Sequence, residues 1–433
     1  MQVVFVSNYI NHHQIPFCNA MFRMLEGSFA FIQTIPMEDD RRRMGWKEES
    51  LPYLVKSYEE TARSKDLIAT ANVVLFGGCE EEAYIHRRLQ DRKPVIRISE
   101  RLYREGQWKM ITPRGLRKKF IDHTRYRSDS VYLLCTGAYV PSDFHLVRAY
   151  PDKMFRWGYF PPMRTYSEEY FKTREANTIP QILWAARFIG LKHPEVPILC
   201  AKYLRDRGLH FHMKMIGGGE LEPSIRRLIA QHNLESTVSL LGYQEPLAVR
   251  DEMERTDIYL CTSNHEEGWG AVINEAMNSG CAVVANYQTG AAPYLIRHGE
   301  NGFVYKDAGP GDLFRIVENL LLNVSLRSTV GKEAYRTITQ KWNADYAAAC
   351  LLERMITLGL LPKETLTGAL LSLKEEALSG ALSAIHDDAL SDALTFGKDE
   401  NARASLIKDD GPCAVAPIIA PGKMYQACIR RQL

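Results

Sequence analysis

The chain alternates short apolar runs with longer segments in which apolar residues recur at helical spacing. This alternation is typical of parallel sheets whose strands are joined by helices. In the first half of the chain the predicted strands are VVFVSN, FAFIQTI, VVLFGG, VIRIS and YLLCTGAY. The alternation restarts further along with ILWAARF, FHMKMIGGG, VSLLGY, IYLCTS and AVVANY. The pattern therefore predicts an α/β protein with two doubly wound, Rossmann-like domains.

A polar stretch with two prolines, FPPMRTYSEEYFKTREANTI, separates the two alternating regions. Proline and a polar run favour a connection between domains. We expect an N-terminal domain at 1–165, a linker at 166–180 and a second domain at 181–340. Ligands of doubly wound sheets bind beyond the carboxyl ends of the strands. The motifs are therefore sought there, along a cleft between the two domains.

The character of the sequence changes near residue 361, where short Ala-Leu-Ser near-repeats begin. Their apolar residues recur at helical spacing and predict an amphipathic helix, followed by an irregular tail. The polar face of this helix is acidic, which favours packing on the protein's own body over docking to a membrane or a partner. We expect residues 361–433 to form a helical or irregular extension.

Composition sets limits on this picture without changing it. A chain of 433 residues is longer than one hydrophobic core usually organises, and a net charge of +2 gives no general attraction to nucleic acid. The nine cysteines are odd in number and form no CxxC pair, which argues against a disulfide framework or a structural zinc site. There is no apolar run of about 18 residues and no basic leader. We expect a cytoplasmic protein that does not span the membrane.

Two cations leave the carboxyl end of the first strand of the second domain. Arg187 ends ILWAAR, and Lys192 follows five positions later. A guanidinium fork and an ammonium point charge together suit a diphosphate. The next strand ends in a glycine turn that includes Gly217 and Gly219, where backbone amides can approach an anion, although tight packing alone also selects glycine.

The stretch EEGWGAVINEAM carries two carboxylates around a Gly-Trp-Gly turn. Glu267 precedes a predicted helix, whereas Glu275 is expected about one and a half turns into it, too far along to complement the helix dipole. An ionised Glu275 can accept hydrogen bonds from a ribose diol. Gly268 and Gly270 expose the first free amides of the helix to a phosphate. Trp269 between them is better explained by loop packing than by sugar stacking.

A small-residue loop, Thr289, Gly290 and Ala291, follows a further strand at the same edge of the sheet. Three loops and one cation pair are therefore expected to converge on one spot, and this convergence is the main signal for a site.

These ordered motifs, from Arg187 and Lys192 through the two glutamates to GENGFVY, resemble the family-4 retaining glycosyltransferases of the GT-B fold. The resemblance is close over roughly residues 182–305 and only in outline over the N-terminal domain. It implies that Arg187 and Lys192 hold the donor diphosphate, that Glu275 binds the ribose and that Glu267 lies against the transferred sugar. It also implies that a helix at 341–360 crosses back to the first domain.

The same resemblance implies a retaining transfer of sugar from a nucleotide diphosphate sugar to a carbohydrate or lipid-linked acceptor. No DxD motif occurs, so we expect no metal and no other cofactor, with the cations stabilising the leaving diphosphate. We expect Glu267 to orient the sugar and stabilise an oxocarbenium-like state rather than to form a covalent adduct.

One departure from the family pattern concerns the loop after the first strand. Many relatives have glycines there, whereas this chain has the polar cluster Asn11, His12, His13 and Gln14 before Pro16. The cluster either caps the helix or contacts donor or acceptor, with His13 the preferred candidate for a contact. The family's N-terminal active-site histidine has no assigned counterpart. The segment RISERLYREG leaves another strand end and is a second candidate for the acceptor side.

Other interpretations stay open at this point. A phosphorylase or epimerase can share the fold, although no motif for a lysine-bound pyridoxal phosphate is present, and a non-catalytic nucleotide-sugar-binding protein would keep the same residues. The basic segment RGLRKKFIDHTRYR, Arg114 to Arg127, is by default a solvated face. Without a recognition motif it gives no support to nucleic-acid binding, and the alternative is peripheral contact with anionic lipid or a lipid-linked acceptor at the inner membrane face.

Overall fold

The computed structural model describes residues 2–39, 49–107, 110, 112–175, 179–309 and 311–365. The chain divides into two compact units. Unit 1 comprises Met1–Tyr159 and the chain from Ala344 onward, and unit 2 comprises Phe160–Asn343. The extension predicted for residues 361–433 lies outside the described residues from residue 366 on. Among the described residues, no helix has the length and apolarity needed to cross a bilayer.

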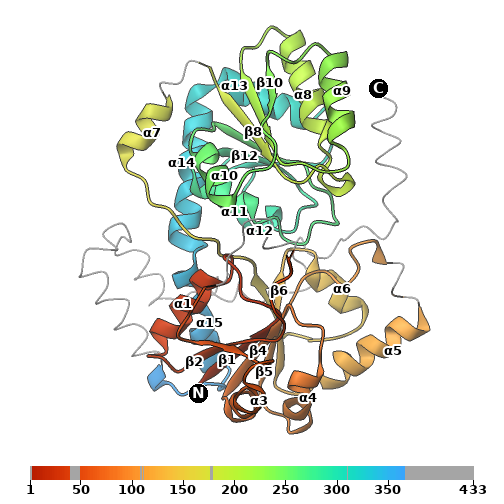
Figure 1. The fold of residues 1–433 in the computed structure, drawn as a ribbon, viewed down its shortest axis with the longest axis vertical. Coiled ribbons are helices and arrows are strands. Elements are labelled where there is room, and N and C mark those ends of the chain that lie inside the picture. Colours follow the sequence, from red (N-terminus) through yellow and green to blue (C-terminus); the bar gives the residue numbers. More distant parts are fainter. Residues whose placement is uncertain are drawn as a thin grey trace. The chain divides into compact units, whose positions relative to one another are not determined.

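Unit 1 is built on a parallel sheet of seven strands in the order β3-β2-β1-β4-β5-β6-β7 (Figure 1). Its central strands are buried along their whole length, because apolar β-branched and aromatic residues face helices on both sides. The strands are β1 Val3–Ser7, β2 Phe29–Gln33, β3 Leu54–Lys56, β4 Val73–Gly77, β5 Val95–Ser99, β6 Val131–Thr136 and β7 Met154–Trp157.

The helices of unit 1 connect successive strands, and one further helix comes from the end of the described chain. That last helix, α15, packs against α1, where Arg23 and Asp345 form an ion pair. The helices are α1 Ile15–Met24, α3 Thr61–Thr70, α4 Ala83–Gln90, α5 Pro113–Asp122, α6 Val140–Leu146 and α15 Ala344–Thr357, with a 3-10 turn at Thr124–Tyr126. Residues 344–357 thus return to the unit that contains the N-terminus.

Unit 2 is built on a parallel sheet of six strands in the order β10-β9-β8-β11-β12-β13. The order reverses between β8 and β11, as it does between β1 and β4 in unit 1. Such a reversal separates the loops that leave the two neighbouring strands and opens a binding crevice. The strands are β8 Gln181–Ala185, β9 His212–Ile216, β10 Val238–Leu240, β11 Ile258–Cys261, β12 Ala282–Asn286 and β13 Phe303–Tyr305.

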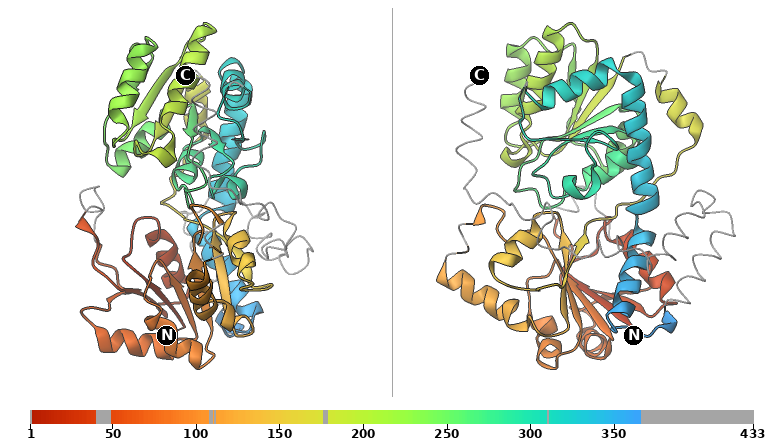
Figure 2. Two further views of the ribbon diagram at one scale, coloured as in Figure 1. Left: turned by 90° about the vertical axis from the view of Figure 1, so that its right-hand side faces the viewer. Right: turned by 180° about the vertical axis from the view of Figure 1, so that it is seen from behind.

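Helices cover both faces of this second sheet (Figure 2). Helix α8 packs against α9 and α13, whereas α11 packs against α10 and α14. Right-handed crossovers that run outward in opposite directions from the reversal place α8 and α11 on opposite faces. The helices are α7 Glu168–Glu175, α8 Glu195–Asp206, α9 Glu222–Gln231, α10 Pro246–Glu254, α11 Val272–Asn278, α12 Ala292–Leu295, α13 Leu313–Leu322 and α14 Val324–Lys341.

All ten strands predicted from the sequence are present, and three others were missed. The missed strands, β3, β7 and β13, have three or four residues and lie at the edges of their sheets. The segment expected as a linker, residues 166–180, differs from expectation because it contains helix α7, which packs against α14 within unit 2. Tyr170 and Arg174 fix this helix through hydrogen bonds to the carbonyl oxygen of Ser279.

Candidate active site

The two loops at the strand reversal of unit 2 carry the main charged candidates. Arg187 and Lys192 follow β8, and Glu267 follows β11. Lys192 and Glu267 form a direct ion pair, and their side chains keep 14% and 18% of their surface exposed. Arg187 is exposed, and its guanidinium makes no hydrogen bond or ion pair with any other residue that the structure describes, although its carbonyl oxygen accepts from the amide of Ile189. Lys192 is therefore held in place by Glu267, whereas the Arg187 side chain, in the same loop, can still bind a ligand.

Asn264 joins these two loops and was not singled out in the sequence. Its backbone N–H donates to the carbonyl oxygen of Leu191 (2.9 Å), and its side chain contacts Nε2 of His193 (3.2 Å). On its own loop, its Oδ1 accepts from the amide of Glu266 and its carbonyl oxygen accepts from the amide of Glu267. Asn264 thus fixes the position of Glu267 relative to Lys192.

Thr262 makes a second connection between the same loops. Its hydroxyl donates to the carbonyl oxygen of Lys192 (2.6 Å) and accepts from the indole N–H of Trp184 (2.7 Å). His193, next to Lys192, adopts a left-handed backbone conformation (φ 49°) and contacts Glu195 through Nδ1. The two contacts of Thr262 bridge 70 and 78 positions of sequence, so no local pattern predicts them.

The glycine turn after β9 packs against the loop that carries Arg187. A Cβ atom at Gly217 would overlap the carbonyl oxygen of Ala186, and one at Gly219 would lie 2.7 Å from that of Phe188. Both glycines also have positive φ angles, which other residues rarely adopt. Close backbone approach therefore explains both glycines, and it brings the turn beside Arg187.

The Gly-Trp-Gly turn packs against the small-residue loop after β12 in a similar way. Gly270 has φ 90°, and a Cβ atom there would lie 2.7 Å from the methyl group of Thr289. The amide of Ala291 donates to the carbonyl oxygen of Trp269, and Gly290 between Thr289 and Ala291 is buried. The amides of Gly268 and Gly270 donate to no acceptor within the described chain, so they are available to an anion.

Trp269 itself belongs to the packing of this turn. Its ring is 1% exposed, stacks on Trp342 (5.6 Å between ring centroids, 14° between planes) and donates from Nε1 to Oδ1 of Asn274 (2.8 Å). The ring is thus held inside unit 2, in agreement with the loop-packing interpretation. Because the ring is buried, only the backbone of Trp269 can contact a ligand.

The position of Glu275 requires a correction. Helix α11 begins at Val272, so Glu275 lies in its first turn rather than one and a half turns along, and its position is compatible with the helix dipole. The reason is that Gly270 and Ala271 still belong to the turn. Burial raises the pKa of the Glu275 carboxyl to about 7, against the opposing effect of the Arg250 and Arg164 guanidinium groups. Its carboxyl oxygens accept no hydrogen bond from the described residues, which suits a group that awaits hydroxyl donors.

The carboxyl edge of the unit 1 sheet carries His13 in the loop after β1. Its ring lies against those of His12 (3.9 Å between centroids) and Tyr159 (5.8 Å, nearly parallel). Burial, and then the neighbouring His12, hold the pKa of His13 well below its usual range, so the ring is neutral near pH 7. The side chain of Gln14 does not cap helix α1; instead Asn11 accepts from the amide of His13 and donates to Gln14.

Two further residues join this cluster and were not singled out individually. The hydroxyl of Tyr159 donates to Glu100 (2.7 Å), which also forms an ion pair with Arg104. Glu100 directly follows β5, within the segment RISERLYREG that the sequence had marked for this edge. His13, Tyr159 and Glu100 thus form a polar group at the carboxyl edge of unit 1.

Comparison with known proteins identifies the domain around the unit 2 site. Residues 166–337 match the family model described as glycosyl transferases group 1. This part of the chain is a group 1 glycosyltransferase domain. The match covers the loops of Arg187, Lys192, Glu267 and Glu275, and the recognition made from the sequence motifs is confirmed.

Curated relatives match over a limited part of their length. The amylovoran biosynthesis glycosyltransferase AmsK of Erwinia amylovora is 32% identical over 139 residues, which are 31% of this chain and 34% of that protein. The putative colanic acid biosynthesis glycosyltransferase WcaL of Escherichia coli is 28% identical over 129 residues, 29% of this chain and 32% of its own length. The chain thus spans about a third of these relatives.

Solved structures resemble the fold of most of the chain. Anabaena Alr3699/HepE in complex with UDP has a TM-score of 0.60 at 14% identity and covers 82% of this chain and all of its own. Sucrose-phosphate synthase from Thermosynechococcus elongatus has a TM-score of 0.58 at 12% identity, with 83% and 99% covered. At such identities the likeness concerns the fold, and it confirms the predicted α/β, GT-B class with two Rossmann-like sheets.

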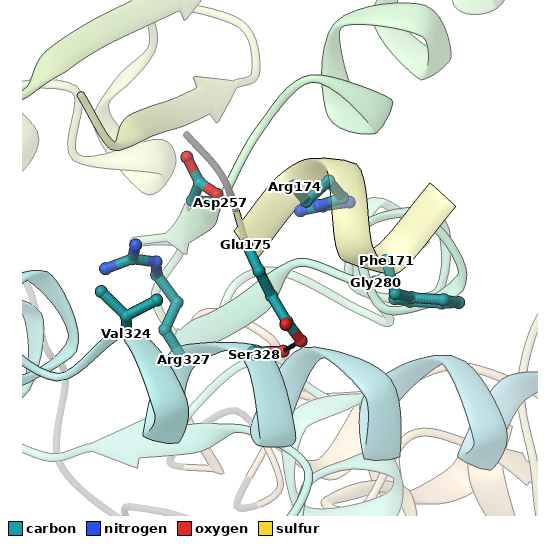
Figure 3. Close-up of a pocket in the computed structure, with 8 residues that line it drawn as sticks. All are labelled: Phe171, Arg174, Glu175, Asp257, Gly280, Val324, Arg327 and Ser328. Atoms are coloured by element: carbon teal, nitrogen blue, oxygen red, sulfur yellow. Dashed lines mark hydrogen bonds between the residues drawn. The ribbon is translucent and has the colours of Figure 1, made fainter. Parts of the chain in front are cut away.

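A pocket at the opposite edge of the unit 2 sheet is separate from these loops (Figure 3). It encloses a cavity of only about 20 Å³ and lies where Asp257 precedes β11 and Gly280 precedes β12. Its two arginines are already engaged: Arg174 donates to the carbonyl oxygens of Thr256 and Ser279, and Arg327 donates to that of Leu320. The pocket therefore reflects packing between α7, α14 and the sheet.

Proposed function

We propose that this group 1 protein is a retaining glycosyltransferase that transfers a sugar from a nucleotide diphosphate sugar to a carbohydrate or lipid-linked acceptor in polysaccharide or glycolipid synthesis. The observation that carries the proposal is the set of cross-tied loops in unit 2, which places Arg187, Lys192, Glu267 and free glycine amides around one strand reversal. The names of AmsK and WcaL support the polysaccharide context.

The donor would bind with its diphosphate on the cations and amides and its ribose on Glu275. Structural neighbours were solved with UDP and with UDP-glucose, which makes a uridine diphosphate sugar the first donor to test. As the bond between the anomeric carbon and the diphosphate oxygen breaks, negative charge builds on the diphosphate. Lys192, held by Glu267, and the amides of Gly268 and Gly270 are fixed donors for that charge, and Arg187 adds a free cation, so transfer would not need a metal held by paired aspartates.

Glu267 would orient the donor sugar and stabilise the positive charge that develops on its ring. Its carboxylate is held by Lys192 and its backbone by Asn264, so it is a positioned electrostatic group. We infer that no covalent glycosyl-Glu267 forms. Isolation of a glycosylated peptide containing Glu267 after reaction with a fluorinated donor would refute this assignment.

The acceptor would bind on unit 1. A pocket with a cavity volume of about 320 Å³ opens there at the carboxyl ends of β2 and β3, at the lower end of the size range of small-molecule sites. It combines apolar side chains with groups that accept hydrogen bonds from sugar hydroxyls; its lining consists of Ile10, Gln33, Glu49, Ser50, Leu51, Leu54, Lys56, Glu59 and Glu60. The described cysteines are free thiols, which supports action in the reducing cytoplasm.

The deciding experiment is a panel of UDP-, GDP- and ADP-sugars, assayed for donor hydrolysis and for a rise in melting temperature. A ligand that binds only the folded protein raises its apparent stability. We expect one base to give both effects and Glu275→Ala to abolish the shift, with Glu235→Ala, an exposed glutamate, as the control. Binding without hydrolysis or transfer to any acceptor would favour a non-catalytic binding protein, and no shift with any donor would contradict the proposal.

A further inference from the structure

Helix α5 of unit 1 is packed with its apolar residues outward. None of its ten residues is buried, and the half-buried ones are Gly115, Lys119 and Asp122. Leu116, Phe120 and Ile121 are 41%, 57% and 42% exposed. Amphipathic helices of soluble proteins turn their apolar stripe toward the core, as α9 does with Ile225 and Ile229. Helix α5 does the reverse.

The outward face of α5 also carries most of its positive charge. Leu116 and Phe120 are four positions apart and share one side of the helix. Arg117 is exposed next to them, whereas Arg114 and Lys118 are exposed further around the helix, on the flank that carries Ile121. These three cations form no ion pair with another residue in the part of the chain that the structure describes. Apolar and basic side chains therefore alternate on one accessible surface.

The helix is anchored, so its outward face is a fixed feature of unit 1. The carbonyl oxygen of Asp122 accepts a hydrogen bond from Arg97 (2.7 Å), and Arg97 forms an ion pair with Glu82. Beyond the helix, Tyr126 is buried in the 3-10 turn that follows. Figure 1 shows α5 at the periphery of unit 1.

We propose that the outward face of α5 docks on the surface of an anionic phospholipid bilayer. Leu116, Phe120 and Ile121 would enter the boundary between headgroups and acyl chains, and Arg114, Arg117 and Lys118 would contact lipid phosphates. Burial of apolar side chains together with attraction to anionic lipid is the physical basis of interfacial helix binding. A nucleic acid would use the cations but would leave the aliphatic side chains exposed. The inference does not depend on the transferase proposal.

Co-sedimentation of the full chain with lipid vesicles tests this surface. One set of vesicles contains phosphatidylcholine alone, and the other contains about one third phosphatidylglycerol, an anionic lipid. We expect binding only to the anionic set, weakening as salt is raised because the Debye length shortens. The Arg114→Gln, Arg117→Gln, Lys118→Gln triple variant should bind roughly 100-fold more weakly, since each surface cation contributes about fivefold.

Apolar variants separate insertion from simple charge attraction. Leu116→Ser with Phe120→Ser should weaken vesicle binding by about tenfold or more, because two inserting side chains are lost. Leu322→Ser, at an exposed leucine of α13 in unit 2, is the matched apolar control. The matched charge control replaces Arg63, Arg87 and Arg226 by Gln, since these exposed arginines pair with acids three or four positions away in the chain. Both controls should bind like the unchanged protein.

The proposal is overturned if the protein binds neutral vesicles equally well, or if neither set of α5 variants lowers binding. It is also overturned if the serine variants bind vesicles normally while the glutamine triple variant loses affinity for vesicles and for single-stranded RNA alike, because α5 would then be a general polyanion surface. Circular dichroism and the melting temperature of each variant show whether it is folded. A change in vesicle binding by a folded α5 variant can then be assigned to the replaced side chains.

Discussion

The carboxyl edges of the two sheets are built in different ways. In unit 2 the loops are tied to one another, because Asn264 and Thr262 bridge from β11 to the loop of Lys192 and the Gly217 turn packs against Ala186. In unit 1 the edge presents side chains instead, with the His13 ring on Tyr159 and Tyr159 on Glu100. One edge is a backbone frame with fixed charges, and the other is a set of polar and aromatic groups.

This difference reflects what each edge would recognise. Phosphate is bound by oriented amides and cations, and these work only when the backbone is held in place. Hydroxyl-bearing acceptors are recognised by side chains, which can be exchanged without rebuilding the loops. The contrast leads us to expect severe losses from single changes in the unit 2 frame and selective losses from changes in unit 1.

The largest effect is expected for Lys192→Ala. Removing a fixed donor for charge on the leaving group should lower kcat of transfer by about 1,000-fold, and it also leaves Glu267 without its ion-pair partner. Steady-state kinetics with the identified donor measure the loss. Lys202→Ala, at a half-exposed lysine of α8 that pairs with Asp206, should leave kcat unchanged. Equal activity of both variants would remove Lys192 from the mechanism.

Asn264→Ala tests the frame without touching a charge. Loss of its side-chain bridge to His193 should let the Glu267 loop shift, and a shift near 1 Å can cost about 100-fold in rate. We expect kcat to fall while the affinity for free nucleotide changes little. Asn319→Ala, at an exposed site on α13, is the control. A variant with normal kcat would show that the loops hold their places without Asn264.

Glu275→Gln should remove a pH dependence from nucleotide binding. The raised pKa, about 7 instead of 4.5, means that the carboxyl ionises only as pH rises through 7 in the folded protein. Because the ionised form is the better acceptor for a ribose diol, affinity should rise through this range in the unchanged protein. In Glu275→Gln it should be flat and about tenfold weaker, by loss of a charged hydrogen bond. Isothermal titration calorimetry at pH 6 to 8 measures the nucleotide affinity of both proteins. An affinity that does not change with pH in the unchanged protein would contradict the prediction.

Ionisation of the Glu275 carboxyl also affects the free energy of unfolding. It should lower this free energy as pH rises, whereas it raises the affinity for nucleotide. Between pH 4.5 and about 7 the native state binds more protons at Glu275 than the unfolded state does, so its ionisation lowers the free energy of unfolding as pH rises across this window. Denaturant titrations should show this decline in the unchanged protein and a smaller one in Glu275→Gln. Identical pH profiles would contradict the burial of the carboxyl.

The smallest effect is expected in unit 1. His13→Ala should lower transfer to the acceptor by about tenfold, the equivalent of one lost hydrogen bond, and leave nucleotide affinity unchanged. Since its pKa is depressed, His13 should add no titration step near neutral pH. His210→Ala, at an exposed histidine, is the control. A loss of nucleotide affinity in His13→Ala would break the proposed division between the edges.

The parts predicted from the sequence are those whose physical cause is local. Central strands such as β4 and β12 are continuous apolar runs because both faces are buried, whereas β3 and β13 have only three residues and leave little pattern. The cations and glycines of unit 2 could be placed at one sheet edge from the sequence because each follows a strand whose carboxyl end lies there, whereas their role in donor binding stays a prediction. The start of α11 was placed one residue early, at Ala271, because alanine is a good helix former and directly follows the Gly270 turn.

The parts that were missed depend on contacts between distant positions. Asn264 acts on His193 and Leu191, and Tyr159 acts on Glu100, 59 positions away. Neither residue belongs to a periodic pattern or a motif, so their contacts can be identified only in the folded structure. The outward face of α5 is a similar case, since its basic run was visible but its orientation was not.

The stacked indoles of Trp269 and Trp342 give this molecule an internal optical probe. Trp342 ends α14, two positions before Ala344 opens the segment that returns to unit 1, while Trp269 sits in the turn beside Glu267. The emission of this pair, isolated by replacing the other four tryptophans with phenylalanine, would report on the Gly-Trp-Gly turn and on the segment that returns to unit 1 at once. Occupancy of the donor loops could thus be followed in real time without any added label.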